Sequence, residues 1–203
     1  LTTRRQRQMC IRDRYKGGAE LSTEALINGH PENTVVYRVN SQSLTFEMMK
    51  SHQDAVWVFT NMANLQDSQI YYAIKNLNYY FVEYDYKFCK FRSVEKHATI
   101  EDECDCNKDK RGKLIAAFIY SSKKTWFMSE AQRKLYTNNF PILEKKENTE
   151  VLSSLFLEGD LKFMNNISDN EKNDKYIILN SNSWIKGTQE CISYAKENNL
   201  EYE

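Results

Sequence analysis

The chain has 203 residues, of which 41% are hydrophobic and 13% aromatic, enough for one large domain or for one domain and part of another. Its 28 basic and 28 acidic residues balance, so bulk charge gives no reason to expect nucleic-acid binding. No run approaches the roughly 20 apolar residues of a membrane span. The cysteine number, five, is odd and does not fit a secreted disulfide framework. We therefore expect a cytoplasmic protein without a transmembrane segment, with peripheral membrane contact left open.

The first segment, residues 1–15, stands apart from the rest of the chain. Five arginines and one aspartate lie within residues 1–14, and the segment has no helical or strand periodicity. It resembles the translated read-through of a sequencing adaptor, so we expect a non-native or disordered arm without functional weight. The alternative is a basic arm that binds polyanions, although the mildly acidic remainder offers no basic face to extend it.

After this arm, short β-branched or aromatic runs alternate with helical patterns, which is typical of a parallel α/β sheet. The first half is predicted to contain a helix from the glycine pair to residue 28, strand 34–39, helix 44–50 capped by Ser43, strand 55–60, helix 67–75 and strand 79–88. A polar segment without clear period, 90–112, is followed by helix 113–120, strand 125–128, a helix capped by Ser129, strand 151–155 and a helix around 160–167.

These elements predict a Rossmann-like domain over residues 16–167 whose first strand is missing, because the arm occupies its place. A charged linker, 168–175, separates it from one more βα unit at 176–203, with a strand at 176–180 and a helix at 188–199. Both ends of the chain look cut. Ligands of such sheets bind at the carboxyl ends of the strands, so the residues directly after each strand are the candidates for chemistry.

The glycine pair opens the string Gly17-Gly18-Ala19-Glu20, which runs into the first helix after Lys16. Adjacent glycines at a helix start let a ligand approach the backbone and its free N–H groups. The string resembles the turn after the first strand in retaining GT-B glycosyltransferases of the large nucleotide-sugar family. The resemblance implies that Gly17, Gly18 and Glu20 lie beside the donor phosphates and the acceptor.

Two later stretches support this resemblance: Phe81–Phe88 followed by Arg92, and Trp126–Gln132 with Ser129 at a strand-to-helix turn. Glu83 and Asp85 are two residues apart on a predicted strand, so both should point to one face and could bind sugar hydroxyls or act as a base. The alternative is a strand end salt-bridged to Lys87 or Arg92. Similar family members have His where this chain has Tyr84, which weakens any transfer of a catalytic His.

The stretch 177–187 looks like the first βα turn of the C-terminal GT-B domain, where the family places an Arg at the strand end and a Lys before a Gly. Lys186 and Gly187 match the second part, and Asn180 stands in place of the Arg. The resemblance implies a nucleotide-sugar donor, a glycan or related acceptor and no catalytic metal. Because only one βα unit of the second domain is present, we expect the fragment itself to be inactive.

Cys89, His97, Cys104 and Cys106 follow the spacing C-x7-H-x6-C-x-C within the polar segment. Thiolates and imidazole are zinc-type ligands, and a long polar loop needs something to order it, so a closed structural zinc site is one expectation. The other is an ordinary acidic loop, since Glu101, Asp102, Glu103 and Asp105 flank the cysteines.

A glycosyltransferase fragment is therefore the leading hypothesis. The alternative from another class is a small metal-stapled Cys/His binding module without enzymatic activity. A dinucleotide-dependent enzyme is disfavoured because the glycines do not follow G-x-G-x-x-G.

Overall fold

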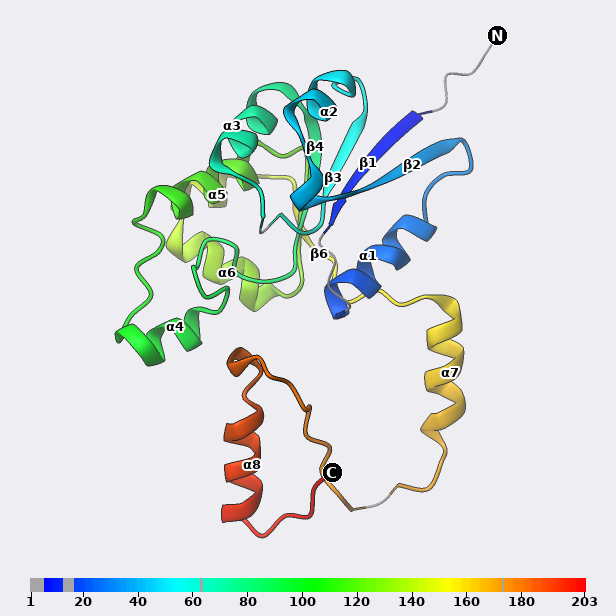
Figure 1. Cartoon of the computed structure of the whole chain (residues 1–203), viewed down its shortest axis with the longest axis vertical. Helices are drawn as coiled ribbons and strands as arrows, with labels where there is room; N and C mark the ends of the chain where they lie inside the picture. Colours follow the sequence, from blue (N-terminus) through cyan, green and yellow to red (C-terminus); the bar gives the residue numbers. More distant parts are fainter. Residues whose placement is uncertain (1–5, 13–16, 63, 173) are drawn as a thin grey trace. The chain divides into compact units, whose positions relative to one another are not determined.

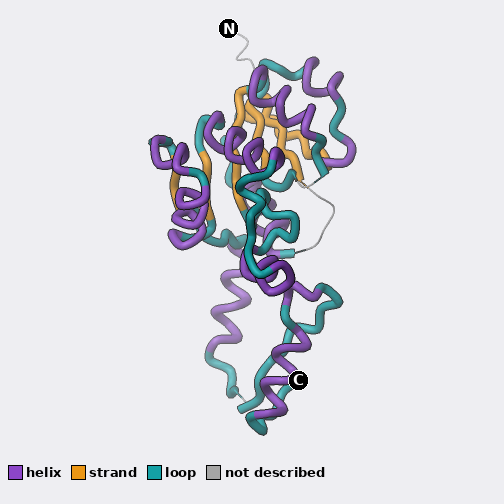
Figure 2. Tube along the Cα trace, turned by 90° about the vertical axis from the view of Figure 1, so that its left-hand side faces the viewer, coloured by secondary structure: helices purple, strands orange, loops and turns teal. Residues whose placement is uncertain are grey.

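The computed structural model describes residues 6–12, 17–62, 64–172 and 174–203. The chain forms two compact units, a first unit, Leu1–Leu157, and a second unit, Glu158–Glu203. Figure 2 shows that the strands of the described chain belong to the first unit, where helices accompany them. Helix α7 (Glu158–Ser168) falls in the second unit, although the sequence placed the domain linker after this helix.

The first unit is built on a parallel sheet of six strands in the order β2-β1-β3-β4-β5-β6 (Figure 1). The strands are β1 (Gln6–Arg12), β2 (Thr34–Asn40), β3 (Val56–Phe59), β4 (Asn78–Glu83), β5 (Thr125–Phe127) and β6 (Thr149–Val151). The chain passes from β1 to β2 on one side and then to β3 on the other, so the topological switch point lies between β1 and β3. The predicted α/β class with a Rossmann-like parallel sheet is confirmed.

Helices follow most strands, as the alternating pattern predicts. The first unit contains α1 (Gly18–Asn28), α2 (Phe46–Ser51), α3 (Asp67–Asn76), α4 (Val94–Glu101), α5 (Lys110–Ser121), α6 (Glu130–Asn139) and two 3-10 turns, Ser41–Ser43 and Pro141–Lys145. Helix α3 packs against α5, and α6 packs beside β5. The second unit adds α7, a 3-10 turn at Trp184–Lys186 and α8 (Thr188–Glu197).

The largest difference from the sequence prediction is strand β1. We expected no strand in the arm, yet Gln6–Arg12 pairs in parallel with β2 on one side and β3 on the other. Backbone groups alone satisfy this ladder, so a segment without apolar alternation can occupy a position flanked by two strands. Residues 1–5 and 13–16, which include Lys16 of the glycine motif, lie outside the described residues. That the arm is non-native stays a prediction.

Three further boundaries differ for local reasons. Strand β4 stops at Glu83 and does not continue to residue 88, because the chain turns there and ion pairs replace the ladder. Thr45, not Ser43, caps α2, since its side chain accepts a hydrogen bond from Met48 N at 3.2 Å. Helix α4 lies inside the segment predicted to be irregular, and Ser93 caps it.

Towards the end of the chain, β6 lies at Thr149–Val151, earlier than the strand predicted at 151–155. The predicted strand 176–180 is reduced to an isolated parallel bridge between Tyr176 and Tyr202. A strand needs a neighbour to satisfy its backbone, and in the described chain the pairing available to Tyr176 is with this short segment. The predicted helix after it is present as α8.

Aromatic side chains from β3, β4 and α5 fill the centre of the first unit. Trp57 and Phe59 are fully buried on β3, and Phe118 of α5 meets Phe59 edge-on with 5.2 Å between ring centroids. Tyr79 stacks on Phe118 at 4.4 Å and donates a hydrogen bond to its carbonyl at 2.6 Å. This packing fixes β4 against α5 and thereby places the segments that follow each of them.

Candidate functional site

The polar residues that follow β4 form a connected cluster at the carboxyl edge of the sheet. Asp85 accepts hydrogen bonds from Lys87 Nζ at 2.6 Å and from Arg92 Nε at 2.7 Å, so its carboxylate lies between two cations. Arg92 Nη2 also lies 3.5 Å from Oδ1 of Asn61, which follows β3. The Asp85 side chain remains 25% exposed. A carboxylate fixed in this way can still accept a hydrogen bond from a hydroxyl group of a ligand.

Glu83, by contrast, is fully buried at the end of β4. Its carboxylate accepts hydrogen bonds from the Tyr136 hydroxyl, from the Asp85 amide at 3.0 Å and from Lys87 Nζ at 3.4 Å. Burial raises the pKa of Glu83 to about 7, against the opposing effect of Lys87. The two carboxylates predicted to share a face both contact Lys87, but Asp85 is the one that a ligand can reach.

Backbone turns, not a strand, carry the residues from 86 to 92. Cys89 N donates to Tyr86 O at 2.9 Å, and Arg92 N donates to Cys89 O at 2.9 Å, which gives two consecutive turns that share Cys89. Arg92 has a φ of 57°, a left-handed conformation that a long side chain adopts only when its surroundings impose it. We call this segment, residues 86–92, the double turn.

The predicted glycine turn begins α1 and is connected to the same edge. Gly17 is the N-cap of α1 and has an extended backbone, and a Cβ placed on Gly18 would meet no atom within 4 Å. The hydroxyl of Thr23, in the next turn of α1, donates to the Ala19 carbonyl at 2.7 Å and lies 3.2 Å from the Tyr84 hydroxyl, from which it can accept a hydrogen bond. Figure 1 shows the start of α1 at the end of the sheet where β3 and β4 finish. Glu20 lies in the first turn of this helix.

Ser129 has a helix-capping role in the structure. Its side chain accepts a hydrogen bond from Gln132 N at 3.1 Å at the start of α6. Gln132 in turn donates from Nε2 to the Asp85 carbonyl at 2.9 Å. Ser129, which the sequence predicted at a strand-to-helix turn, therefore contacts the Asp85 segment through Gln132, one turn along the helix.

The second feature of this region is the cluster of three thiols and one imidazole predicted from the sequence. The cluster consists of Cys89, His97, Cys104 and Cys106. Each residue contributes one ligand atom, a thiol sulfur or an imidazole nitrogen, and these four atoms all lie within 4.8 Å of one another. These cysteines are not in disulfides. In a tetrahedral site with Zn–S bonds of about 2.3 Å, neighbouring ligand atoms lie roughly 3.8 Å apart. The four side chains are close enough to hold a metal ion.

The histidine of this cluster has the orientation that a ligand needs. His97 is fully buried, and its Nδ1 lies 3.5 Å from both Cys89 Sγ and Cys106 Sγ. Its Nε2 lies 2.9 Å from Glu101, one helical turn away on α4, and Lys90 pairs with the same carboxylate at 2.7 Å. An Nε2–H that donates to Glu101 leaves the Nδ1 lone pair directed at the thiols, the arrangement found around zinc-bound histidines.

The close approach of two segments brings Cys106 to this position. A Cβ placed on Gly112, in the first turn of α5, would lie 1.9 Å from the carbonyl oxygen of Cys106. Only glycine lets the loop after α4 pass this close to α5. Gly112 is thus part of the cluster's architecture, and its role was not predicted from the sequence.

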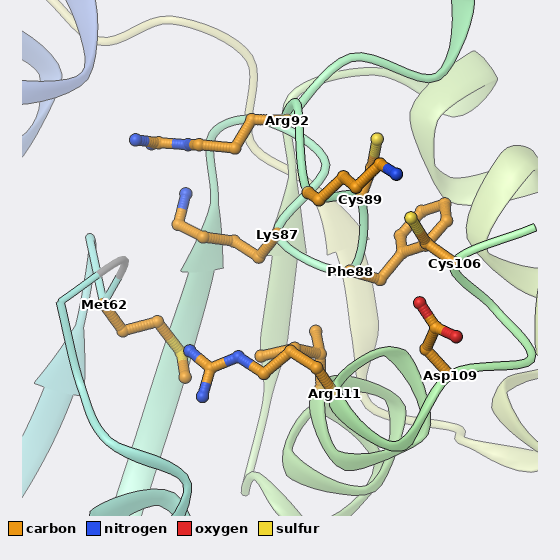
Figure 3. Close-up of a pocket in the computed structure, with 10 residues that line it drawn as sticks. Met62, Lys87, Phe88, Cys89, Arg92, Cys106, Asp109 and Arg111 are labelled. Carbon is orange, nitrogen blue, oxygen red and sulfur yellow. The ribbon is translucent and has the colours of Figure 1, made fainter. Parts of the chain in front are cut away.

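A pocket of about 210 Å³ lies between the Asp85 cluster and the thiol cluster (Figure 3). Its walls carry four basic side chains and one acidic one: Lys87, Lys90, Arg92, Arg111 and Asp109. Lys90 pairs with Glu101, and Arg111 pairs with Asp67, so acidic partners offset these charges. The pocket is also smaller than the roughly 300–1,000 Å³ of a typical cofactor site, so it would admit part of a ligand.

The remaining predicted donor residues, Lys186 and Gly187, lie in the second unit. Lys186 ends a 3-10 turn, and Gly187 is the N-cap of α8 with a φ of 71°, which only glycine adopts readily. Thr188 ties this turn together, because its hydroxyl donates to Leu179 O at 2.7 Å. The Lys-Gly pair therefore stands at a helix start, and its role in donor binding stays a prediction.

Four contributors to the site were not among the predicted residues. Tyr136 and Gln132 reach Glu83 and Asp85 from far along the chain, and Asn61 also acts through a long-range contact, whereas Glu101 contacts His97 within one turn of α4, a helix that was not predicted. Only Asn61 had a usable signal, because it directly follows a predicted buried strand.

A scan against protein-family models found no match, and searches of the curated proteins and of the solved structures found none either. In the part of the chain that the structure describes, no helix combines the length and apolar character needed to cross a membrane.

Proposed function

We propose that this chain is part of a glycosyltransferase that transfers a sugar from a nucleotide-sugar donor to a glycan or related acceptor. The observation that supports this best is the partly exposed Asp85 carboxylate, held at the carboxyl edge of a parallel sheet between Lys87 and Arg92. Asp85 is placed to accept the hydrogen bond of an acceptor hydroxyl and to take its proton during transfer. The start of α1 at Gly17 supplies a helix N-terminus suited to an anionic group of the donor.

Lys186 and Gly187 belong to the same proposal as donor-binding residues, because a lysine at a helix start suits a diphosphate. Glu83 has a different role in it: its buried carboxylate orients Lys87 and the Asp85 amide without touching substrate. No catalytic metal is needed for these steps.

The first prediction tests Asp85. The full-length product of the gene is incubated with a panel of nucleotide sugars labelled in the sugar, and both transfer and hydrolysis are measured. We expect Asp85→Asn to lower kcat at least about tenfold, since a positioned base contributes roughly 10²–10⁴ in rate. Asp54→Asn, at an exposed turn, is the matched control and should retain full activity. Turnover of no nucleotide sugar, or an unchanged kcat for Asp85→Asn, would contradict the proposal.

We propose in addition that the cluster of Cys89, His97, Cys104 and Cys106 binds a structural zinc ion. Three thiolates and one imidazole complete a tetrahedral zinc shell and leave no open position for substrate. The Glu101 contact to His97 supports this assignment, because zinc-bound histidines ordinarily donate their second nitrogen to such a partner. If the protein binds zinc but the full-length protein transfers no sugar, the alternative is favoured, namely a binding module that a metal ion stabilises.

The second prediction is that the protein purified without chelators carries one zinc per chain, measured by elemental mass spectrometry. Cys104→Ser should lower the zinc affinity at least tenfold, and Glu101→Gln should lower it by about tenfold through the lost histidine partner. Cys191→Ser removes the exposed cysteine of the second unit and should leave the zinc content unchanged. If zinc-supplemented wild-type protein holds no zinc, the assignment is wrong.

A further inference from the structure

We propose that the metal centre positions the Asp85 cluster by fixing the double turn, residues 86–92. This inference rests on the proposed zinc site. It assigns to that site a positioning role at the sheet edge, beyond stabilising the loop between α4 and α5.

The first step is the position of Cys89. It is the metal-ligating candidate that both backbone turns share, since its amide donates to Tyr86 O and its carbonyl accepts from Arg92 N, each at 2.9 Å. Cys89 Sγ lies 3.4 Å from Ser93 O, and its thiol proton is released when the sulfur binds a metal as a thiolate. A ligand bond to Cys89 Sγ therefore holds the middle of the double turn from one side.

The second step is what the turns present on the other side. Lys87 lies two residues before Cys89 and Arg92 lies three residues after it, and both contact Asp85. Figure 3 shows the Lys87 and Arg92 side chains extending to one side of the loop, away from Cys89 and Cys106. The same few residues thus connect the thiol cluster to the Asp85 carboxylate.

The third step is the strain at the end of the double turn. Arg92 is held at a φ of 57°, a left-handed conformation that is unfavourable for a residue other than glycine. The hydrogen bond from Arg92 to Asp85 and the packing of Phe88 against Tyr136 hold the turn against Asp85 and α6. A bond from a metal to Cys89 adds a constraint on the side of the thiol cluster. The other ligands are anchored on α4, which contains His97, and in front of α5.

The third prediction is tested by hydrogen exchange followed by mass spectrometry on the whole chain, with and without zinc. Removing zinc with a chelator should speed exchange at least tenfold in peptides covering residues 84–93, and adding zinc back should restore protection. Helix α3 (Asp67–Asn76) is the internal reference and should exchange at an unchanged rate. Cys104→Ser should reproduce the metal-free result, although Cys104 lies outside the double turn. Cys104→His, which restores a zinc ligand, should recover protection.

Three results separate the possible failures. Wild-type protein that binds no zinc would overturn the zinc site and this inference with it, while leaving the Asp85 assay standing. Zinc that binds and leaves without changing exchange at residues 84–93 would overturn the inference alone. Equal acceleration in α3 would also overturn it, because the metal would then stabilise the whole first unit and not the double turn in particular.

Discussion

Replacing Gly112 by alanine is expected to destabilise the first unit by about 3 kcal/mol, the upper range for overpacking a well-packed site. Alanine in a helix usually stabilises by up to about 1 kcal/mol relative to glycine. Here the sign reverses, because the added Cβ would lie 1.9 Å from the Cys106 carbonyl oxygen and 2.9 Å from its carbonyl carbon. Both obstacles are backbone, so the loop itself must move, and with it Cys106 of the thiol cluster.

The measurement is urea unfolding followed by tryptophan fluorescence in a Trp184→Phe background. Trp57 is buried in the first unit and Trp126 lies on β5, whereas Trp184 belongs to the second unit, so the remaining signal reports the first unit. Gly18→Ala is the matched control, since Gly18 is also helical, lies in the same unit, and a Cβ there would meet no atom within 4 Å. A neutral Gly112→Ala variant that keeps its zinc would contradict the close approach.

The fold class could be predicted because it rests on local patterns. Apolar runs such as 55–60 and helix signals such as Ser129 are properties of short segments, and the structure contains the corresponding β3 and α6. Strand β1 could not be predicted, because its sequence has no strand periodicity and its place in the sheet comes from backbone pairing with two neighbours.

For the candidate site, too, one part could be predicted from the sequence and another part could not. The thiol and imidazole cluster could be anticipated from residue type and spacing within one loop, and its four members are brought together. The surroundings of Glu83 and Asp85 could not, because they come from α6 across about fifty positions of sequence: Tyr136 bonds to Glu83 (|i−j| of 53) and Gln132 bonds to the Asp85 carbonyl (|i−j| of 47). From the sequence, Glu83 and Asp85 share one face of a strand, so their environments should be alike. In the structure Glu83 is buried and Asp85 is not, and this difference arises from the packing of the core.

The buried Glu83 carboxylate is expected to make the first unit less stable as the pH rises from about 5 to 8. Burial raises its pKa from the usual value of 4.5 to about 7, while Lys87 acts against this shift and the Asp85 charge adds to it. Between these two values the folded chain holds a proton that the unfolded chain has lost. Stability is then fully present below the unfolded pKa and falls as the pH rises through the folded pKa.

At about 1.4 kcal/mol per unit of pKa difference, the loss across this window is of the order of 3 kcal/mol. Glu83→Gln keeps an acceptor for the Tyr136 hydroxyl and the Asp85 amide but cannot ionise. We therefore expect the free energy of unfolding of wild type, measured relative to Glu83→Gln by urea titration in the Trp184→Phe background, to decrease between pH 5 and pH 8.

Glu32→Gln, at an exposed position after α1, should show no such change relative to wild type. A difference between wild type and Glu83→Gln that stays constant or grows with pH would mean that Glu83 is ionised throughout, held in that state by Lys87. The Glu83 side chain would then be a charged carboxylate over the whole range from pH 5 to pH 8, and would not hold a proton in the folded chain.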